Sequence, residues 1–114
     1  MNAIYEETRP WGNFRQFTKN EPSTVKVIKI LPGQSLSLQT HEKRSEFWQI
    51  IDGDGVVEIE GVKTATQKGQ EFFIKTGEKH RATAGKNALE ILEIAFGEFD
   101  ESDITRLEDQ YGRN

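Results

Sequence analysis

The stretch Val25-Lys-Val-Ile-Lys-Ile-Leu-Pro-Gly-Gln-Ser-Leu-Ser-Leu-Gln39 decides the fold class of this sequence. Its first six residues, Val25–Ile30, are rich in β-branched side chains, which favour strands. Pro32-Gly33 then supplies a turn pair. After the turn, Ser35–Gln39 alternates polar and apolar residues, which is the period of a half-buried strand. The stretch therefore predicts two strands joined by a turn.

The same strand chemistry recurs along the chain, with glycine turns between the segments. Further strands are predicted at Phe47–Ile51, Val56–Glu60, Glu71–Lys75 and Leu89–Phe96. Between the first two, Asp52-Gly-Asp-Gly55 is the strongest β-hairpin signal in the sequence. Short strands at regular spacing predict an all-β, antiparallel sandwich or barrel.

The C-terminal end is expected to be a short helical or extended segment. For the helical form, Ser102 or Asp103 would be the N-cap of a helix over 103–110, with Ile104 and Leu107 on one face.

Size and charge limit the classes of function. The 114 residues fit one domain, spanning 1–114, since domains are typically about 100–150 residues long. The net charge of -4 and the pI near 5.2 argue against nucleic-acid binding. No run approaches the about 20 apolar residues of a membrane span, and the acidic N-terminus lacks the features of a signal peptide. Because the sequence has no cysteine, it has no disulfide and no thiolate zinc site, and we expect a cytoplasmic protein.

Two histidines, the only ones in the sequence, lie in similar turn-and-strand contexts. His41 follows the strand that ends at Gln39, Glu46 lies on the next strand, and His80 follows the turn at Gly77. Imidazole nitrogens and a carboxylate from separate strands are ligands for first-row metals. Gln39 shares side-chain parity with His41 and is a candidate fourth ligand through its carbonyl oxygen. The alternative is that each histidine only hydrogen-bonds a neighbour, and spacing alone leaves both possibilities open.

The order of the glycines and the candidate ligands resembles a known superfamily. The patterns Gly33-x7-His41-x4-Glu46-x6-Gly53 and Gly69-x7-Gly77-x2-His80 are similar to the paired motifs of the cupins. More narrowly, the chain resembles the type II mannose-6-phosphate isomerase domain, which usually forms the C-terminal part of a bifunctional mannose-1-phosphate guanylyltransferase. The resemblance implies an antiparallel cupin β-barrel, a jelly roll.

Separated blocks carry the narrower resemblance, in the order of the family. They are Arg9-Pro-Trp-Gly12, Leu36-Ser-Leu-Gln39 with His41, Arg44, Glu46 and Trp48, Gly77-x2-His80-Arg81, and a closing segment with Asp103-Ile104, Arg106 and Tyr111-Gly112-Arg113. The resemblance implies that His41, Glu46 and His80 hold a divalent metal, with Gln39 as the fourth ligand. It also implies interconversion of mannose 6-phosphate and fructose 6-phosphate. Zinc is the expected metal, with manganese, cobalt, nickel and iron as alternatives. The guanylyltransferase part has no counterpart in this sequence, so no guanylyltransferase activity is expected.

One departure from the family bears directly on the site. Lys43 stands where the family carries the second histidine of an HxH pair, and a protonated lysine cannot ligate a metal. We consider Lys43 both as the catalytic base and as an exposed charge that attracts the substrate phosphate, and we favour the second role. Arg81 is a candidate for gripping the phosphate or supporting an enediolate intermediate. Trp11 is a candidate for binding the substrate where it would cover the mouth of the barrel, with packing as its alternative role.

Three functions remain open on this basis. The first is the metal-dependent isomerase. The second is a non-catalytic cupin that binds a sugar phosphate or a sugar nucleotide, which the substitution at Lys43 favours. The third is a different cupin enzyme, such as an iron dioxygenase. We also expect a homodimer, because a domain this small gains by burying a sheet edge or face against a second copy.

Overall fold

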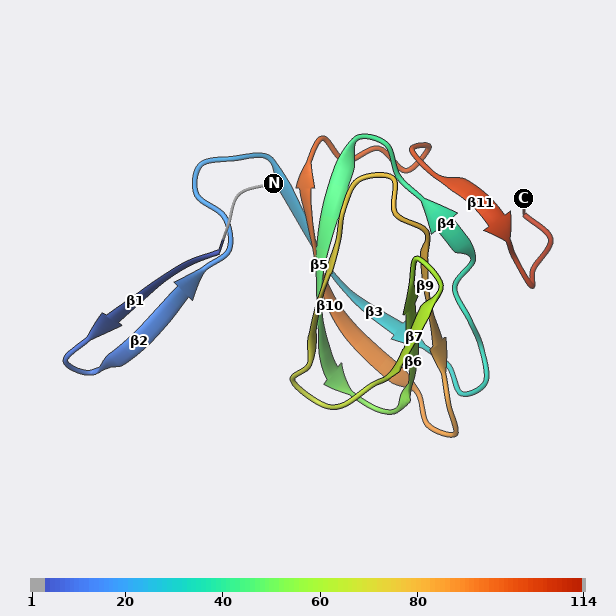
Figure 1. The fold of residues 1–114 in the computed structure, drawn as a ribbon, viewed down its shortest axis with the longest axis horizontal. Helices are drawn as coiled ribbons and strands as arrows, with labels where there is room; N and C mark the ends of the chain where they lie inside the picture. The colour runs from blue at the N-terminus through green and yellow to red at the C-terminus, as the bar shows by residue number, and fades with distance from the viewer. Residues whose placement is uncertain (1–3, 114) are drawn as a thin grey trace.

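The computed structural model describes residues 4–113, and the regular secondary structure within this range consists of β-strands (Figure 1). In chain order the strands are β1 (Tyr5–Arg9), β2 (Gly12–Gln16), β3 (Ser23–Ile30), β4 (Leu38–Thr40), β5 (Arg44–Asp52), β6 (Gly55–Ile59), β7 (Val62–Ala65), β8 (Glu71–Ile74), β9 (His80–Ala84), β10 (Leu89–Gly97) and β11 (Thr105–Glu108). All of their pairings are antiparallel, which confirms the predicted fold class. Residues 4–113 contain no helix long and apolar enough to cross a membrane.

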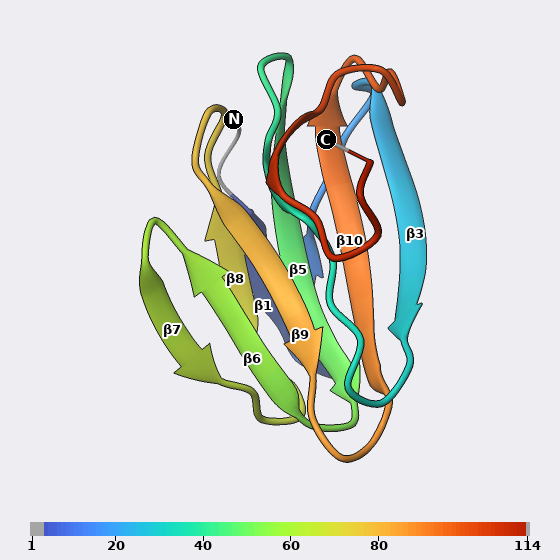
Figure 2. The ribbon, with the colours of Figure 1, turned by 90° about the vertical axis from the view of Figure 1, so that its right-hand side faces the viewer.

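Two sheets form the body of the molecule and face each other (Figure 2). One sheet has the strand order β3-β10-β5-β8, and the other has the order β11-β4-β9-β6-β7. The two sheets are separate ladders, so the predicted barrel is realised as two layers rather than as one closed sheet. β1 and β2 pair with each other and form a third, two-stranded sheet.

At one end of the space between the layers, the inward-facing side chains are aliphatic. Ile30 and Leu89 are cross-strand neighbours there, and Ile91 lies opposite Ile50. All four side chains are at most 4% exposed and belong to one hydrophobic cluster. Burying a side chain of this size stabilises a fold by about 1.5–3 kcal/mol. This end is therefore the hydrophobic core.

Toward the other end of the same strands, the inward-facing side chains become polar. Lys26, Glu93 and Trp48 are neighbours in one cross-strand row, and Glu46 lies opposite Ala95 in the next row. Glu93 is 5% exposed and Glu46 is 1% exposed. Charged groups cost several kcal/mol to bury unless they are paired, so their presence here indicates a site rather than more core.

A second hydrophobic cluster lies on the opposite, outer face of the four-stranded sheet. Phe47, Ile94 and Phe96 form this cluster, and Ile4 and Phe17 from the N-terminal region pack against it. The period of two along β5 and β10 places these residues on the outer face, because their chain neighbours point inward. The four-stranded sheet is thus apolar on parts of both faces.

The glycine-rich turn at 52–55 does not make the predicted hairpin. β5 pairs with β10 and β8, whereas β6 pairs with β9 and β7, so the turn carries the chain from one sheet to the other. Gly53 has a φ of 91°, a conformation that favours glycine. The carboxylate of Asp54 accepts hydrogen bonds from the backbone N–H groups of Lys86 and Asn87. These contacts attach the turn to a distant segment instead of folding it back on its own strand.

The helix predicted over 103–110 is wrong, and the extended alternative is confirmed. Thr105–Glu108 forms β11, which extends the five-stranded sheet by pairing with β4. Asp103 caps no helix, because its carboxylate accepts hydrogen bonds from the backbone N–H groups of Glu42 and Lys43. Pairing with an open sheet edge therefore outweighs the weak helical pattern of this segment.

Candidate metal centre

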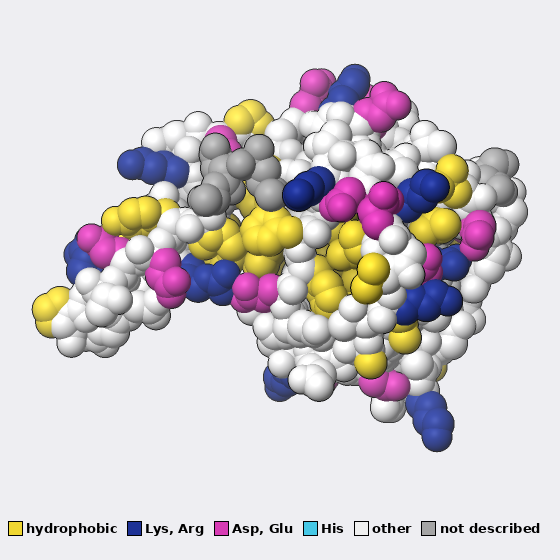
Figure 3. All heavy atoms as spheres, viewed as in Figure 1, with side chains coloured by type: hydrophobic (Ala, Val, Ile, Leu, Met, Phe, Trp, Pro, Cys, Tyr) yellow, Lys and Arg dark blue, Asp and Glu magenta, His cyan; other side chains and the backbone are white. Residues whose placement is uncertain are grey.

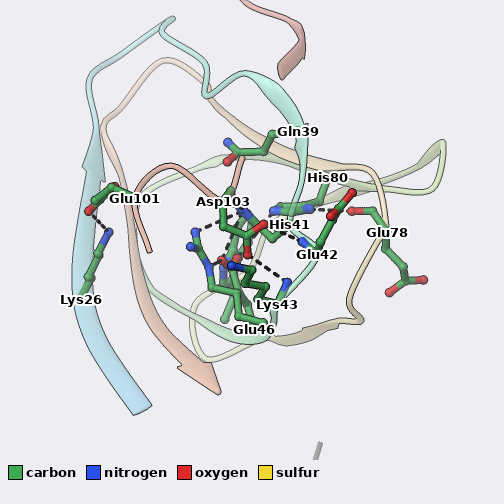
Figure 4. Close-up of polar contacts among 12 residues, drawn as sticks. Lys26, Gln39, His41, Glu42, Lys43, Glu46, Glu78, His80, Glu101 and Asp103 are labelled. Atoms are coloured by element: carbon green, nitrogen blue, oxygen red, sulfur yellow. Dashed lines mark hydrogen bonds and ion pairs between the residues drawn. The ribbon is translucent and has the colours of Figure 1, made fainter. Parts of the chain in front are cut away.

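Three polar side chains from different parts of the chain meet at the polar end of the interlayer space (Figure 4). His41 directly follows β4, Glu46 lies on β5, and His80 opens β9. His41 Nε2 lies 3.4 Å from Glu46 Oε2, and His80 Nε2 lies 3.6 Å from Glu46 Oε1. The three residues can offer ligand atoms that all lie within 4.8 Å of one another. Each residue is at most 3% exposed, so the cluster is buried.

Backbone carbonyls fix the orientation of both imidazole rings. His41 Nδ1 lies 2.6 Å from the carbonyl oxygen of Asp103, and His80 Nδ1 lies 2.8 Å from that of Glu78. Because a carbonyl only accepts, each Nδ1 carries the proton and donates, which leaves the lone pair on Nε2. Burial, the largest influence, lowers the pKa of His80 and keeps it neutral. Metal-ligating histidines are typically oriented by such an acceptor on the other ring nitrogen.

A buried arginine lies against the same three residues. Arg44 Nε donates to Glu46 Oε2 at 3.0 Å, and Arg44 Nη2 lies 3.3 Å from His41 Nε2, to which it donates. The other oxygen of Glu46, Oε1, accepts a hydrogen bond of 3.0 Å from Trp48 Nε1. Arg44 therefore neutralises the carboxylate, and a cation bound by Glu46 and His41 would compete with it for both groups.

The donor set suits a divalent metal ion. The Nε2 atoms of two histidines and the oxygen of one carboxylate are ligands that zinc and other first-row divalent metals accept. His41, Glu46 and His80 would hold the ion, and a fourth position would be left for another ligand. The cluster predicted from the sequence is thus assembled, and it is able to bind a metal.

The cluster lines a cavity of about 160 Å³ between the two sheets. Several charged residues share this cavity, namely Lys26, Arg44, Glu93, Glu101 and Arg106. Lys26 Nζ pairs with Glu101 at 3.3 Å, which places an ion pair beside the cavity (Figure 4). Polar groups of both signs therefore line the space next to the candidate ligands.

Glu93 is a site residue that the sequence analysis missed. Its carboxyl group lies in the cavity, and burial, reinforced by the negative charge of Glu46, raises its pKa to about 7. The signal was present in the alternation of β10, because Glu93 has the inward parity of Leu89 and Ile91. The inward position of Glu93 on β10, the most apolar strand, would therefore have predicted a buried carboxyl group.

Arg106 is a second cavity residue that was not predicted as part of the site. It comes from β11, where it lies opposite Gln39 of β4. Its Nε is buried and has no hydrogen-bond partner within residues 4–113. Since buried donors are nearly always paired, this guanidinium has capacity for an anionic ligand.

Comparison with known proteins places the chain in a family. Residues 2–109 match the family described as "Mannose-6-phosphate isomerase C-terminal". The chain belongs to this family. Similar proteins include a mannose-1-phosphate guanylyltransferase of Salmonella montevideo, 37% identical over 96% of this chain and 24% of that protein. The alginate biosynthesis protein AlgA of Pseudomonas aeruginosa is 38% identical over 95% of this chain and 23% of that protein. The chain thus spans about a quarter of the length of these curated relatives.

Solved structures confirm the cupin fold of this mannose-6-phosphate isomerase C-terminal domain. The capsular polysaccharide assembling protein CapF of Staphylococcus aureus superposes with a TM-score of 0.70 at 18% identity, covering 96% of this chain and 34% of CapF. A cupin protein of Bacteroides fragilis superposes with a TM-score of 0.61 at 21% identity, covering 71% of this chain and 74% of that chain. At these identities the likeness concerns the fold alone.

Gln39, the predicted fourth ligand, lines the same cavity as the histidines. Its backbone lies opposite His80 in the pairing of β4 with β9. Its Nε2 donates to the carbonyl of Ser37 at 3.2 Å. The side chain is therefore near the cluster, and its role as a ligand stays a prediction.

Arg81 and Lys43, the predicted catalytic residues, lie outside the cavity. Arg81 follows His80 on β9 and so faces the other way, where it pairs with Glu58 at 3.1 Å and with Glu108 at 3.0 Å. Lys43 precedes Arg44 and is exposed, in a surface hollow next to the cluster. Neither side chain is brought to the cluster, and both roles stay predictions.

Trp11, the predicted cover of the barrel mouth, lies in the turn of the β1–β2 hairpin. It is 71% exposed and stacks on Phe14 with ring centroids 6.4 Å apart. The hairpin projects away from the two sheets (Figure 1), so Trp11 does not reach the cavity of its own chain. Its substrate-binding role likewise stays a prediction.

Proposed function

We propose that this domain interconverts mannose 6-phosphate and fructose 6-phosphate, using a divalent metal, zinc in the first place, held by His41, Glu46 and His80. One observation carries the proposal: the possible ligand atoms of two histidines and one buried carboxylate lie within 4.8 Å of one another, in a member of the mannose-6-phosphate isomerase C-terminal family. A bound metal would supply a Lewis acid that polarises the carbonyl oxygen of the sugar.

The reaction moves one proton between C2 and C1 of the open-chain sugar through a cis-enediol, and a hydroxyl proton moves between O2 and O1. A base must take the proton from C2 and return it to C1 on the same face. We assign this step to Glu93, because its carboxyl group lies in the cavity and burial raises its pKa from the ordinary value, which makes it a stronger base. Lys43, the candidate from the sequence, is the alternative base.

The substrate also carries a phosphate, which needs a cationic partner. Arg106 fits this role, since its buried Nε has no partner in the described part of the chain and it lines the cavity. Arg81 and Lys43 would contribute positive charge from the surface, and their effect on substrate affinity should be smaller because solvent screens them.

The test is a coupled isomerase assay on chelator-treated protein that is resupplied with zinc, manganese, cobalt or nickel. Glu46→Gln removes the ligand charge with little change in volume, so we expect loss of both turnover and metal binding measured by calorimetry. Glu42→Gln changes an exposed carboxylate in the same loop and should leave both unchanged. A Glu46→Gln protein that binds metal and turns over like Glu42→Gln would contradict the proposal.

A second function, a non-catalytic binder of a sugar phosphate or sugar nucleotide, is favoured by the position of Arg44. This guanidinium already occupies Glu46 Oε2 and the lone pair of His41, so the cluster is electrically satisfied without a metal. Folded wild-type protein that gives no turnover with any metal, yet binds mannose 6-phosphate by calorimetry, would favour this function over the isomerase.

A further inference from the structure

Asp103 makes hydrogen bonds with three consecutive residues of the segment that joins β4 to β5 (Figure 4). Its backbone carbonyl oxygen lies 2.6 Å from Nδ1 of His41. Its carboxylate accepts the backbone N–H groups of the next two residues, Glu42 through Oδ1 and Lys43 through Oδ2, each at 2.9 Å. One residue thus contacts both the ring of a candidate ligand and the turn that carries that ligand.

The strand after Asp103 and the turn before it determine where Asp103 lies. Thr105 of β11 lies opposite Thr40 of β4, so the residues just before β11 pass the residue just after β4. In the turn, the backbone N–H and the hydroxyl of Ser102 donate to Oδ1 of Asp100 at 2.9 and 2.7 Å. The N–H of Asp103 donates to the carbonyl of Asp100 at 2.9 Å. The turn is therefore shaped by its own hydrogen bonds, and the register of β11 sets its position.

The end of the molecule where this turn meets the β4–β5 connection carries charged side chains of both signs, at the top of Figure 3. Glu42 and Lys43 are exposed on the connection, and Glu98 and Glu101 are exposed on the segment that leads to the turn. Exposed charged groups bury little apolar area, which is the main source of packing energy. The contact between the two segments therefore depends largely on the hydrogen bonds of Asp103.

His80, the other histidine of the cluster, is oriented from its own turn. Its Nδ1 lies 2.8 Å from the carbonyl oxygen of Glu78, two residues earlier in the chain. The side chain of Glu78 accepts the N–H of Lys75 at 2.6 Å, and the N–H of Glu78 donates to the carbonyl of Lys75 at 3.0 Å, so this turn is closed locally. The acceptor for His41 is instead 62 positions away in the sequence. One ring is therefore held locally, and the other is held by a distant segment.

We propose that Asp103 is a positioning residue for His41: its carboxylate holds the turn at residues 42–43 and so keeps its own carbonyl oxygen at Nδ1 of the ring. Arg44 Nη2 lies 3.3 Å from Nε2, the atom that a metal would take. With Nε2 occupied by a metal, the hydrogen bond to Asp103 is the one that the described residues still give the ring. A group that orients a ligating histidine in this way also strengthens metal binding. The inference rests on the proposed metal site and does not depend on the isomerase activity.

Nitrogen NMR of the histidine rings in metal-free protein tests the positioning, because the sequence has two histidines and His80 is the internal control. A His80→Gln variant assigns the two signals. Asp103→Ala removes both acceptor oxygens of the carboxylate, so the Nδ1 proton of His41 should exchange with water at least about tenfold faster, while that of His80 keeps its wild-type rate. Asp103→Asn retains one acceptor oxygen and should give an intermediate rate. An unchanged rate for His41 in Asp103→Ala, or an equal increase for both rings, would overturn the proposal.

Asp54→Ala is the matched control for the metal. The carboxylate of Asp54 also accepts two consecutive backbone N–H groups, those of Lys86 and Asn87, but it lies beyond the far end of β5. The two alanine variants should therefore lose comparable stability in chemical denaturation. Zinc binding measured by calorimetry separates them, because Asp103→Ala should weaken it by about 10–100-fold and Asp54→Ala should leave it within about twofold of wild type.

Equal zinc affinities in the two alanine variants would show that Asp103 has a structural role alone, and would overturn its role toward the metal. Wild-type protein that binds no zinc would instead contradict the proposed function. In that case the NMR comparison of His41 with His80 still decides whether Asp103 orients the ring, because it is made on metal-free protein.

Discussion

The two ends of the space between the sheets are built by the same strands and differ in what those strands place inside. At one end Ile50, Leu89 and Ile91 fill the space, and at the other end Glu46 and Glu93 occupy the same inward rows of β5 and β10. The aliphatic end stabilises the fold through burial. The polar end buries charge, which costs free energy unless each charge has a partner. The same strands thus stabilise the fold at one end and position the polar groups of the candidate site at the other.

The largest loss of stability should come from removing Arg44, the cation paired with Glu46 at the polar end. Arg44→Met leaves the buried carboxylate of Glu46 without its ion pair. In protein freed of metal with a chelator, we expect the unfolding free energy to fall by about 3–5 kcal/mol. Zinc should restore part of this loss, because a bound ion supplies the missing charge. Chemical denaturation with and without zinc measures both quantities.

Arg9→Met is the control for this comparison. Arg9 is exposed and pairs with Glu7, whose side chain is also partly exposed, and such surface pairs contribute about 0–1 kcal/mol. If the two variants lose equal stability, the polar end does not depend on Arg44.

The next effect should come from the aliphatic end. Ile91→Ala leaves a cavity beside Ile50 and should cost about 2–4 kcal/mol, as such truncations usually do. The metal affinity of the folded protein should stay within about twofold of wild type, because the cavity is in the other part of the interlayer space. Denaturation and calorimetry on the same sample provide the two values, and a parallel loss of both would mean that the ends are coupled.

The smallest effect should be the pH dependence that Glu93 gives to metal-free protein. Its folded pKa of about 7 lies above the value of about 4.3 for an unfolded chain, so the folded state binds the proton more tightly. This contribution favours folding at low pH and is lost as the pH rises from about 4 to 7. Glu93→Gln removes this titrating group. Between pH 5 and about 8, the unfolding free energy of the wild type should therefore fall by about 1–3 kcal/mol relative to that of the variant. Identical pH profiles for the two proteins would show that Glu93 does not titrate in this range.

The sequence contained enough to predict the strands that alternate or carry β-branched residues, such as Ser23–Ile30 and Leu89–Gly97. It did not reveal which strands pair, because the turn at 52–55 has hairpin chemistry whether it folds back or crosses between sheets. Nor did it reveal that Thr105–Glu108 would pair with β4, because this pairing depends on where the folded chain places the edge of the sheet.

The site divides in a similar way. His41, Glu46 and His80 could be predicted, because rare residue types at a familiar spacing are visible in one sequence. Arg81 follows His80 in sequence, but neighbours on a strand face opposite ways, so adjacency alone does not place its side chain in the cavity, and its role stays a prediction. Applying the same period of two to Glu93 would have placed it inside.

The hydrogen bond from His41 to the backbone of Asp103 has a consequence for how the site forms during synthesis. The two residues are 62 positions apart, so the ring cannot reach its final orientation when its own strand emerges. At about 5–20 residues per second, a ribosome needs about 3–12 s to make that intervening chain. During this delay the first histidine and its neighbouring glutamate are made but unassembled. A metal bound in that interval would be held by a nascent chain with an incomplete set of ligands. The folded site could discriminate between metals only after synthesis of the chain had passed Asp103.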